Sequence, residues 1–101
     1  MKERMCRMKN VTLDFSCVET REEIHAILKE ILEFPAYYGD NLDALYDCLT
    51  DISEDVVITA YYTADGSPAA AYLKKVQQVF IDAEKENPHL AAFFLISYET
   101  E

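Results

Sequence analysis

The sequence predicts an α/β domain in which three parallel strands form a small sheet packed with helices. Three short segments have the apolar or alternating pattern of strands: residues 11–15, 56–62 and 91–98. Segments with helical periodicity and capping residues separate them, in the order strand, helix, helix, strand, helix, strand. Strands joined through helices are usually parallel with right-handed connections, so we expect a three-stranded parallel sheet.

Length and composition predict a single domain. A chain of 101 residues, of which 50% are hydrophobic, can build one core but not two, and it contains no linker or internal repeat. We expect residues 11–101 to form the domain. Residues 1–10 are basic but have no apolar segment behind them, so we expect a frayed extension and not a secretory signal. No apolar run approaches the ~18 residues of a membrane span, so no membrane partner is expected.

The net charge and the cysteine content limit the classes of function that the chain could have. The net charge of −10 disfavours nucleic-acid binding, because phosphates would be repelled, and it suits a basic protein partner. Cys6, Cys17 and Cys48 are odd in number and lack zinc-ligand spacing, which predicts a reduced, cytoplasmic chain. His25 and His89 have no second ligand at a suitable spacing and are expected to be surface or capping residues. We predict no metal, no cofactor and no enzymatic activity.

The first strand and helix are predicted from alternation and capping. Residues 11–15 alternate as a short strand. Thr20 and Glu23 form a capping box with Thr20 as the N-cap, and the helix ends near Pro35, which cannot continue it. The apolar side of this helix comprises Ile24, Ile27, Leu28, Ile31 and Leu32.

A turn and a second helix follow, ending at about Ile52. We expect Gly39 to take a positive φ, and Asp40 or Asn41 to cap the helix with its short polar side chain. One face of the helix is an apolar stripe, with Cys48 at its edge. The stripe comprises Leu42, Leu45, Leu49 and Ile52.

The opposite face of the second helix is acidic. At ~100° per residue, Asp43, Asp47 and Asp51 lie opposite the apolar stripe. Aspartates four apart repel by roughly 0.2–0.5 kcal/mol per pair. No Lys or Arg occurs in residues 30–73 to offset this repulsion. A solvated helix surface is the simplest explanation of a charge run, but these charges have one sign and lie beside tyrosines, which favours a recognition surface. The tyrosines are Tyr37, Tyr38 and Tyr46.

The second half of the chain predicts a strand, a long helix and a last strand. Residues 56–62 are β-branched and aromatic, and an Asp-Gly turn follows within residues 63–66. Ser67 is the expected N-cap of the third helix, with Pro68 at its first position. The helix ends at Asn87 and the proline after it. Residues 91–98 are almost wholly apolar and are the best candidate for the central strand.

Residues 37–50 resemble the barstar family, the intracellular inhibitors of barnase-type bacterial ribonucleases. The family pattern is Tyr-Tyr-Gly-x-Asn-Leu-Asp-Ala-Leu-Trp-Asp-x-Leu-Thr, and this chain departs from it only at Tyr46, which replaces the tryptophan. A weaker match covers residues 79–83, and the order of elements agrees over roughly residues 11–97. The resemblance implies the family's fold, a small parallel sheet with helices.

The resemblance also implies how the second helix acts. The family's aspartates at Asp43 and Asp47 enter the ribonuclease active site in place of RNA phosphates, and the second is the main mimic. The tyrosine at Tyr37 packs on the catalytic histidine of the enzyme. Further contacts along the edge are implied for Gly39, Asn41 and Leu42.

The chain departs from the family at positions on the implied partner surface. Tyr46 stands in place of the helix tryptophan, and Asp82 replaces a glutamate of the third helix. Asp51 and Ile52 occupy positions where the family commonly has glycine and an aromatic residue. We expect Tyr46 and Asp82 to contact the partner, and the rim of the surface to include Tyr38, Asp51 and Ile52.

Two functions remain open at this point. The first is inhibition of a basic bacterial ribonuclease, barnase-like or a diverged toxin nuclease, by an immunity protein that forms a one-to-one complex. The second is an acidic interaction module that binds some other basic protein. Retention of Asp43 and Asp47 beside Tyr37 favours the first, and a neighbouring gene for a small basic nuclease would support it.

Overall fold

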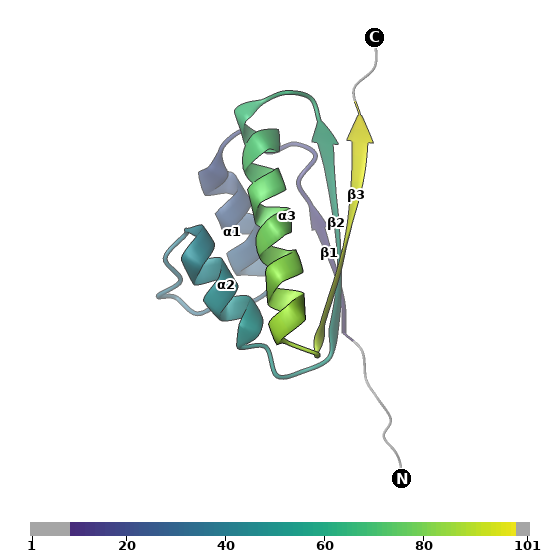
Figure 1. Cartoon of the computed structure of the whole chain (residues 1–101). Coiled ribbons are helices and arrows are strands. Elements are labelled where there is room, and N and C mark those ends of the chain that lie inside the picture. Colours follow the sequence, from purple (N-terminus) through teal and green to yellow (C-terminus); the bar gives the residue numbers. More distant parts are fainter. Residues whose placement is uncertain (1–8, 99–101) are drawn as a thin grey trace.

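The computed structural model describes residues 9–98, which form three helices and one three-stranded sheet (Figure 1). This result confirms the predicted α/β class and element order. The extension expected for residues 1–10 lies outside the described residues, apart from Lys9 and Asn10, which belong to the first strand. The elements are β1 (Lys9–Asp14), α1 (Arg21–Ile31), α2 (Leu42–Thr50), β2 (Val56–Ala64), α3 (Pro68–Glu86) and β3 (Leu90–Tyr98).

The sheet is parallel throughout, as predicted, but its strand order is β1-β2-β3. Ile58 of β2 pairs with Val11 on one side and Ala92 on the other. The expectation that residues 91–98 form the central strand was therefore wrong, because β3 is an edge. All the helices lie on one side of the sheet (Figure 1). Two successive right-handed crossovers that keep their helices on one side must step in the same direction, which leaves β2 in the middle.

The other side of the sheet is not covered by helices. This explains why the apolar sequence of β3 led to the wrong prediction that it is the central strand. Phe93 and Leu95 of β3 are 57% and 50% exposed, and Tyr61 of β2 is exposed beside them. The register pairs Tyr61 with Leu95 and Thr59 with Phe93. An apolar strand usually indicates burial on both faces, whereas β3 is covered on one face only.

Local signals set the helix boundaries as predicted. The Thr20 hydroxyl accepts a hydrogen bond from the Glu23 N–H at 3.1 Å, and the Glu23 carboxylate accepts one from the Thr20 N–H at 3.3 Å. At the start of α3, the Ser67 hydroxyl accepts from the Ala70 N–H at 3.1 Å, with Pro68 as the first helical residue. Each of these bonds satisfies a first-turn N–H that has no partner within its own helix.

The hydrophobic core lies between the sheet and the helices. Leu45 and Leu49, from the predicted stripe of α2, are fully buried, whereas Leu42 and Ile52 are only partly buried. Burial of each leucine stabilises the fold by about 1.5–3 kcal/mol relative to exposure. Figure 1 shows α2 as the helix farthest from the sheet, lying beside α3. Its inner face is therefore anchored mainly on α3, and its acidic face is directed outward.

Candidate functional site

The entry to α2 is built by three consecutive polar or small residues. Asn41 is the N-cap, and its side-chain oxygen accepts a hydrogen bond from the Ala44 N–H at 2.7 Å. The positive φ expected at Gly39 falls instead on Asp40, at 55°. Asp tolerates this left-handed conformation better than most residues, because its short side chain can bond locally.

Gly39 is needed for space and not for backbone conformation. A Cβ at this position would lie 3.1 Å from Asn41 Nδ2 and 3.7 Å from Ala44 Cβ. The same Asn41 amide donates a hydrogen bond to the Gly39 carbonyl at 3.1 Å. A side chain on residue 39 would therefore crowd the cap that starts α2.

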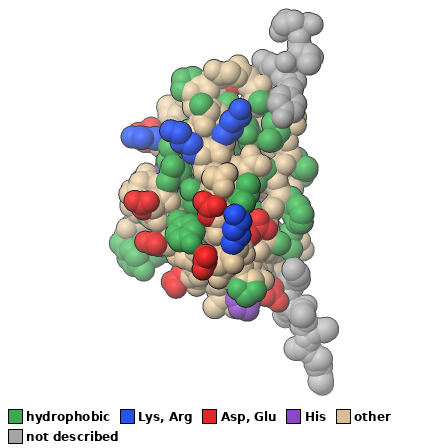
Figure 2. Space-filling view, viewed as in Figure 1, with side chains coloured by type: hydrophobic (Ala, Val, Ile, Leu, Met, Phe, Trp, Pro, Cys, Tyr) green, Lys and Arg blue, Asp and Glu red, His purple; other side chains and the backbone are tan. Residues whose placement is uncertain are grey.

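Three aspartates follow the cap on the outer face of α2, as predicted. Asp43, Asp47 and Asp51 are all exposed, and Asp51 is the C-cap residue at the negative end of the helix dipole. Within residues 9–98, none of the three forms an ion pair. The part of the chain that the structure describes therefore supplies no cation to compensate these carboxylates. In Figure 2, acidic side chains gather over α2 and the lower half of α3, while most basic ones lie toward the upper end of the view.

A loop between α1 and α2 holds two tyrosines in opposite environments. Tyr37 is 86% exposed, whereas Tyr38 is only 6% exposed. The structure therefore does not support the rim contact expected for Tyr38, because its ring belongs to the core. The Tyr38 hydroxyl shares a hydrogen bond of 2.6 Å with His25 Nδ1.

His25 is likewise not the surface or capping residue that was expected. It is 1% exposed, and its second ring nitrogen, Nε2, shares a hydrogen bond of 2.7 Å with the Tyr72 hydroxyl of α3. Burial lowers the pKa of His25 and raises the pKa of Tyr38 and of Tyr72. The imidazole is therefore neutral at pH 7 and joins α1, the loop and α3.

A hollow of about 270 Å³ separates the loop from the outer face of α2. It has an apolar floor and a rim that combines Tyr37 with three acidic residues. The rim is formed by Glu33, Tyr37, Asp47 and Asp51. The floor is formed by Leu32, Phe34, Pro35, Cys48 and Ile52. Burial, with the nearby charges of Asp47 and Asp51, raises the pKa of the Cys48 thiol, so it contributes to the floor as a neutral group.

The described residues offer little to other kinds of site. Among residues 9–98, no three His, Cys, Asp or Glu side chains gather as metal ligands would. Within the same range, no helix is both long and apolar enough to cross a membrane.

The sequence model of the family described as "Barstar (barnase inhibitor)" matches residues 8–97. The chain belongs to the barstar family. A Bacillus subtilis (strain 168) protein named "Putative ribonuclease inhibitor YrdF" is 35% identical over 82 residues, which cover 78% of this chain and 89% of that protein. The resemblance found in residues 37–50 is thus confirmed over nearly the whole chain.

The barstar-family fold brings only part of the predicted surface together. Tyr37, Asp47, Asp51 and Ile52 meet at the hollow. The remaining predicted residues are not among those that line it. Of these, Gly39, Asn41 and Asp43 are exposed near the start of α2, and Leu42 and Tyr46 are partly buried. Asp82 is exposed on α3, where its carboxylate accepts a hydrogen bond from Gln78 Nε2 at 3.1 Å.

Two residues that shape the candidate site were not predicted from the sequence. Glu33 lies on the rim of the hollow with a φ of 59°, just beyond the end of α1. The left-handed conformation closes the helix, since the Phe34 N–H then donates to the Lys29 carbonyl at 3.0 Å. A polar residue one position beyond a helix end was the available signal, although glycine is the usual occupant.

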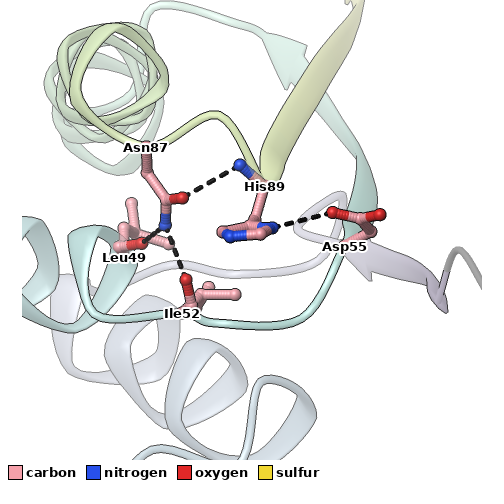
Figure 3. Close-up of polar contacts among 5 residues, drawn as sticks. All are labelled: Leu49, Ile52, Asp55, Asn87 and His89. Atoms are coloured by element: carbon pink, nitrogen blue, oxygen red, sulfur yellow. Dashed lines mark hydrogen bonds and ion pairs between the residues drawn. The ribbon is translucent and has the colours of Figure 1, made fainter.

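The second missed residue is Asn87, which holds the C-terminal end of α2. It is 3% exposed, and its side-chain amide donates to the carbonyls of Leu49 and Ile52, each at 2.9 Å (Figure 3). Its side-chain oxygen accepts from the His89 N–H at 2.9 Å. His89 Nδ1 in turn lies 2.8 Å from an Asp55 carboxylate oxygen. The sequence predicts only that Asn87 ends α3.

Proposed function

We propose that the protein inhibits a basic ribonuclease in a one-to-one complex, with the acidic face of α2 and the adjoining hollow covering the active site. The observation that carries the proposal is the meeting of Tyr37 with Asp47 and Asp51 around one open hollow. A ribonuclease must present cations where it binds RNA phosphates. Fixed carboxylates satisfy the same cations without offering a bond to cleave.

The energetics of the free protein support a role in binding. Two Asp pairs four residues apart cost roughly 0.2–0.5 kcal/mol each, and the C-terminal position of Asp51 adds about 0.3–1 kcal/mol. No internal cation among residues 9–98 offsets this cost. A basic partner would replace the repulsion among these carboxylates with attraction to its own cations, which favours the bound state.

The hollow would accept one long basic side chain of the ribonuclease. The aliphatic stem of an arginine or lysine would lie on the apolar floor, while its charged end would reach the carboxylates at the rim. Tyr37 would cover the same side chain from the loop, in a cation–π arrangement. Because Asp51 and Glu33 add charge next to Asp47, we infer a preference for arginine, which can bond two carboxylates at once.

An RNA-cleavage assay tests the proposal. Barnase, and any small basic nuclease encoded beside this gene, is titrated with the protein at low micromolar concentration. We expect cleavage to stop at one equivalent, and Asp47→Ala to weaken inhibition while the charge-matched control Glu22→Gln, at the start of α1, does not. Undiminished cleavage by every nuclease at micromolar inhibitor would refute ribonuclease inhibition and favour the acidic interaction module.

A further inference from the structure

Tyr37 cannot be held in place by its own side chain. At 86% exposed, it makes almost no contact with the rest of the protein, so its position depends on the backbone on either side. The next residue, Tyr38, is nearly buried, and its N–H donates to the Pro35 carbonyl at 2.9 Å. The orientation of the exposed tyrosine is therefore set by what holds Tyr38.

The Tyr38 ring is held from two directions. Its ring centroid lies 4.9 Å from that of Phe34 in a tilted arrangement, which fills the space beneath the loop. Its hydroxyl reaches His25 Nδ1 at 2.6 Å, a short contact between two nearly buried groups. Ring packing alone leaves a side chain free to slide, whereas a directed hydrogen bond fixes its depth and rotation.

His25 is itself fixed by a second bond. Its Nε2 is 2.7 Å from the Tyr72 hydroxyl, so one neutral ring donates through one nitrogen and accepts through the other. Both ring nitrogens are thus satisfied, and the pair of bonds defines one ring orientation. A buried network that is fully satisfied in this way favours a single conformation over alternatives.

We propose that His25 is a positioning residue for partner binding: through Tyr38 it fixes the loop that presents Tyr37 to the ribonuclease. The proposal rests on the proposed function for its partner, but not for its geometry. A loop that is already ordered in the free protein loses less entropy on binding. Loosening it should shorten the lifetime of the complex without slowing the charge-steered encounter.

The two tyrosines that bond to His25 supply a matched pair of variants. Tyr38→Phe and Tyr72→Phe each remove one hydroxyl from the same imidazole, but only the first frees the loop. With barnase as the partner, we expect Tyr38→Phe to raise the dissociation rate about tenfold, as for loss of a buried hydrogen bond, and Tyr72→Phe to raise it less than about twofold. The association rates should stay within about twofold.

Substitutions at His25 separate positioning from stability. An asparagine amide reaches about as far as Nδ1 and can keep the bond to Tyr38, whereas a glutamine amide reaches about as far as Nε2 and can keep the bond to Tyr72. We expect His25→Asn to dissociate more slowly than His25→Gln. Thermal melting of both variants shows whether they differ in stability. Equal dissociation rates for the two variants, or faster dissociation of His25→Asn, would overturn the proposal.

A measurement on the free protein keeps this test independent of the partner. The amide of residue 38, which bonds to Pro35, should exchange its hydrogen about tenfold faster in Tyr38→Phe than in Tyr72→Phe, when both are compared well below their melting temperatures. Similar exchange in the two variants would refute the positioning role. If the wild-type protein binds no nuclease but the exchange rates differ as expected, the proposed function fails and the positioning of the loop stands.

Discussion

At the scale of single residues, α2 has buried side chains that stabilise the fold and exposed aspartates that do not. Leu45 and Leu49 are fully buried, while Asp43 and Asp47 of the same nine-residue helix, and Asp51 at its C-cap, are exposed. The aspartates have no cationic partner among residues 9–98, so the folded state gains no ion pair from their charges. Their presence is better explained by binding than by stability.

Asp47→Ala is expected to weaken binding strongly and to leave folding intact. In the complex, its removal strands buried cations and should cost roughly 3–5 kcal/mol, while in the free protein it relieves repulsion worth a few tenths of a kcal/mol. Asp43→Ala should show a smaller loss of affinity. Titration calorimetry with the nuclease and thermal melting measure the two effects, and Leu45→Ala, which opens a core cavity worth about 2–5 kcal/mol, is the control that melts lower. Normal binding by a destabilised Asp47→Ala would show that this aspartate is structural.

His25 makes the stability of the fold depend on pH. Burial lowers its pKa in the folded state below the ordinary value of 6.5. The unfolded chain therefore takes up a proton more readily, so the stabilisation from the neutral imidazole is complete above about pH 6.5 and declines as the pH falls toward the lower folded pKa. Urea unfolding between pH 8 and 5 should show this decline in the wild type and not in His25→Gln. An equal pH dependence in both would exclude His25 as its source.

At the scale of elements, α2 is a short helix that is stabilised from outside. Nine residues are too few for a stable isolated helix, and its charges work against it. Asn41 caps its first turn, and Asn87 bonds to the carbonyls of Leu49 and Ile52 at its end. The acidic face thus has its orientation set by an asparagine from each side, one from the loop and one from the connection between α3 and β3.

Asn87→Asp should destabilise the protein more than Asn87→Ala. Alanine removes two donors from buried carbonyls and should cost about 2–4 kcal/mol, at 1–3 kcal/mol for each unsatisfied group with partial access to water. Aspartate has the same shape but places a negative oxygen against those carbonyls, at the negative end of the helix dipole. Chemical denaturation of both variants decides the matter, and a higher stability for the aspartate variant would contradict this account of the contact.

At the scale of the whole molecule, the element order and the parallel sheet could be predicted, because local signals such as the Thr20 capping box and Ser67–Pro68 mark each helix. The contacts of His25 could not, since its partner Tyr72 lies 47 residues away. Asn87 and Leu49 are likewise separated by 38 residues. The position of β3 was missed because apolar character does not reveal how many faces a strand has covered. On the surface, the acidic face of α2 was predictable from helical periodicity, but the hollow was not, since it depends on how the loop packs beside α2.

Long-range electrostatic attraction should accelerate association with a basic nuclease. The net charge is −10, and residues 30–73 contain no Lys or Arg. We expect the association rate, measured by stopped flow, to fall steeply between about 10 and 300 mM salt, where the Debye length drops from ~30 Å to below ~8 Å. The dissociation rate should change much less. A flat association rate over this range would exclude electrostatic steering.

Because β3 is an uncovered edge of the sheet, we expect the protein to need its net negative charge to stay soluble. The nine residues of β3 contain no charged side chain. From outside the sheet, Glu84 accepts a hydrogen bond from the Ala92 N–H at 3.1 Å, and the Asn87 carbonyl accepts one from the Leu90 N–H at 3.2 Å. A long apolar edge of this kind invites strands of other molecules to add to it. Mutual repulsion between strongly acidic copies keeps those edges apart. Neutralising the carboxylates by acid, or screening them with concentrated salt, should therefore drive colloidal assembly even while the fold is intact.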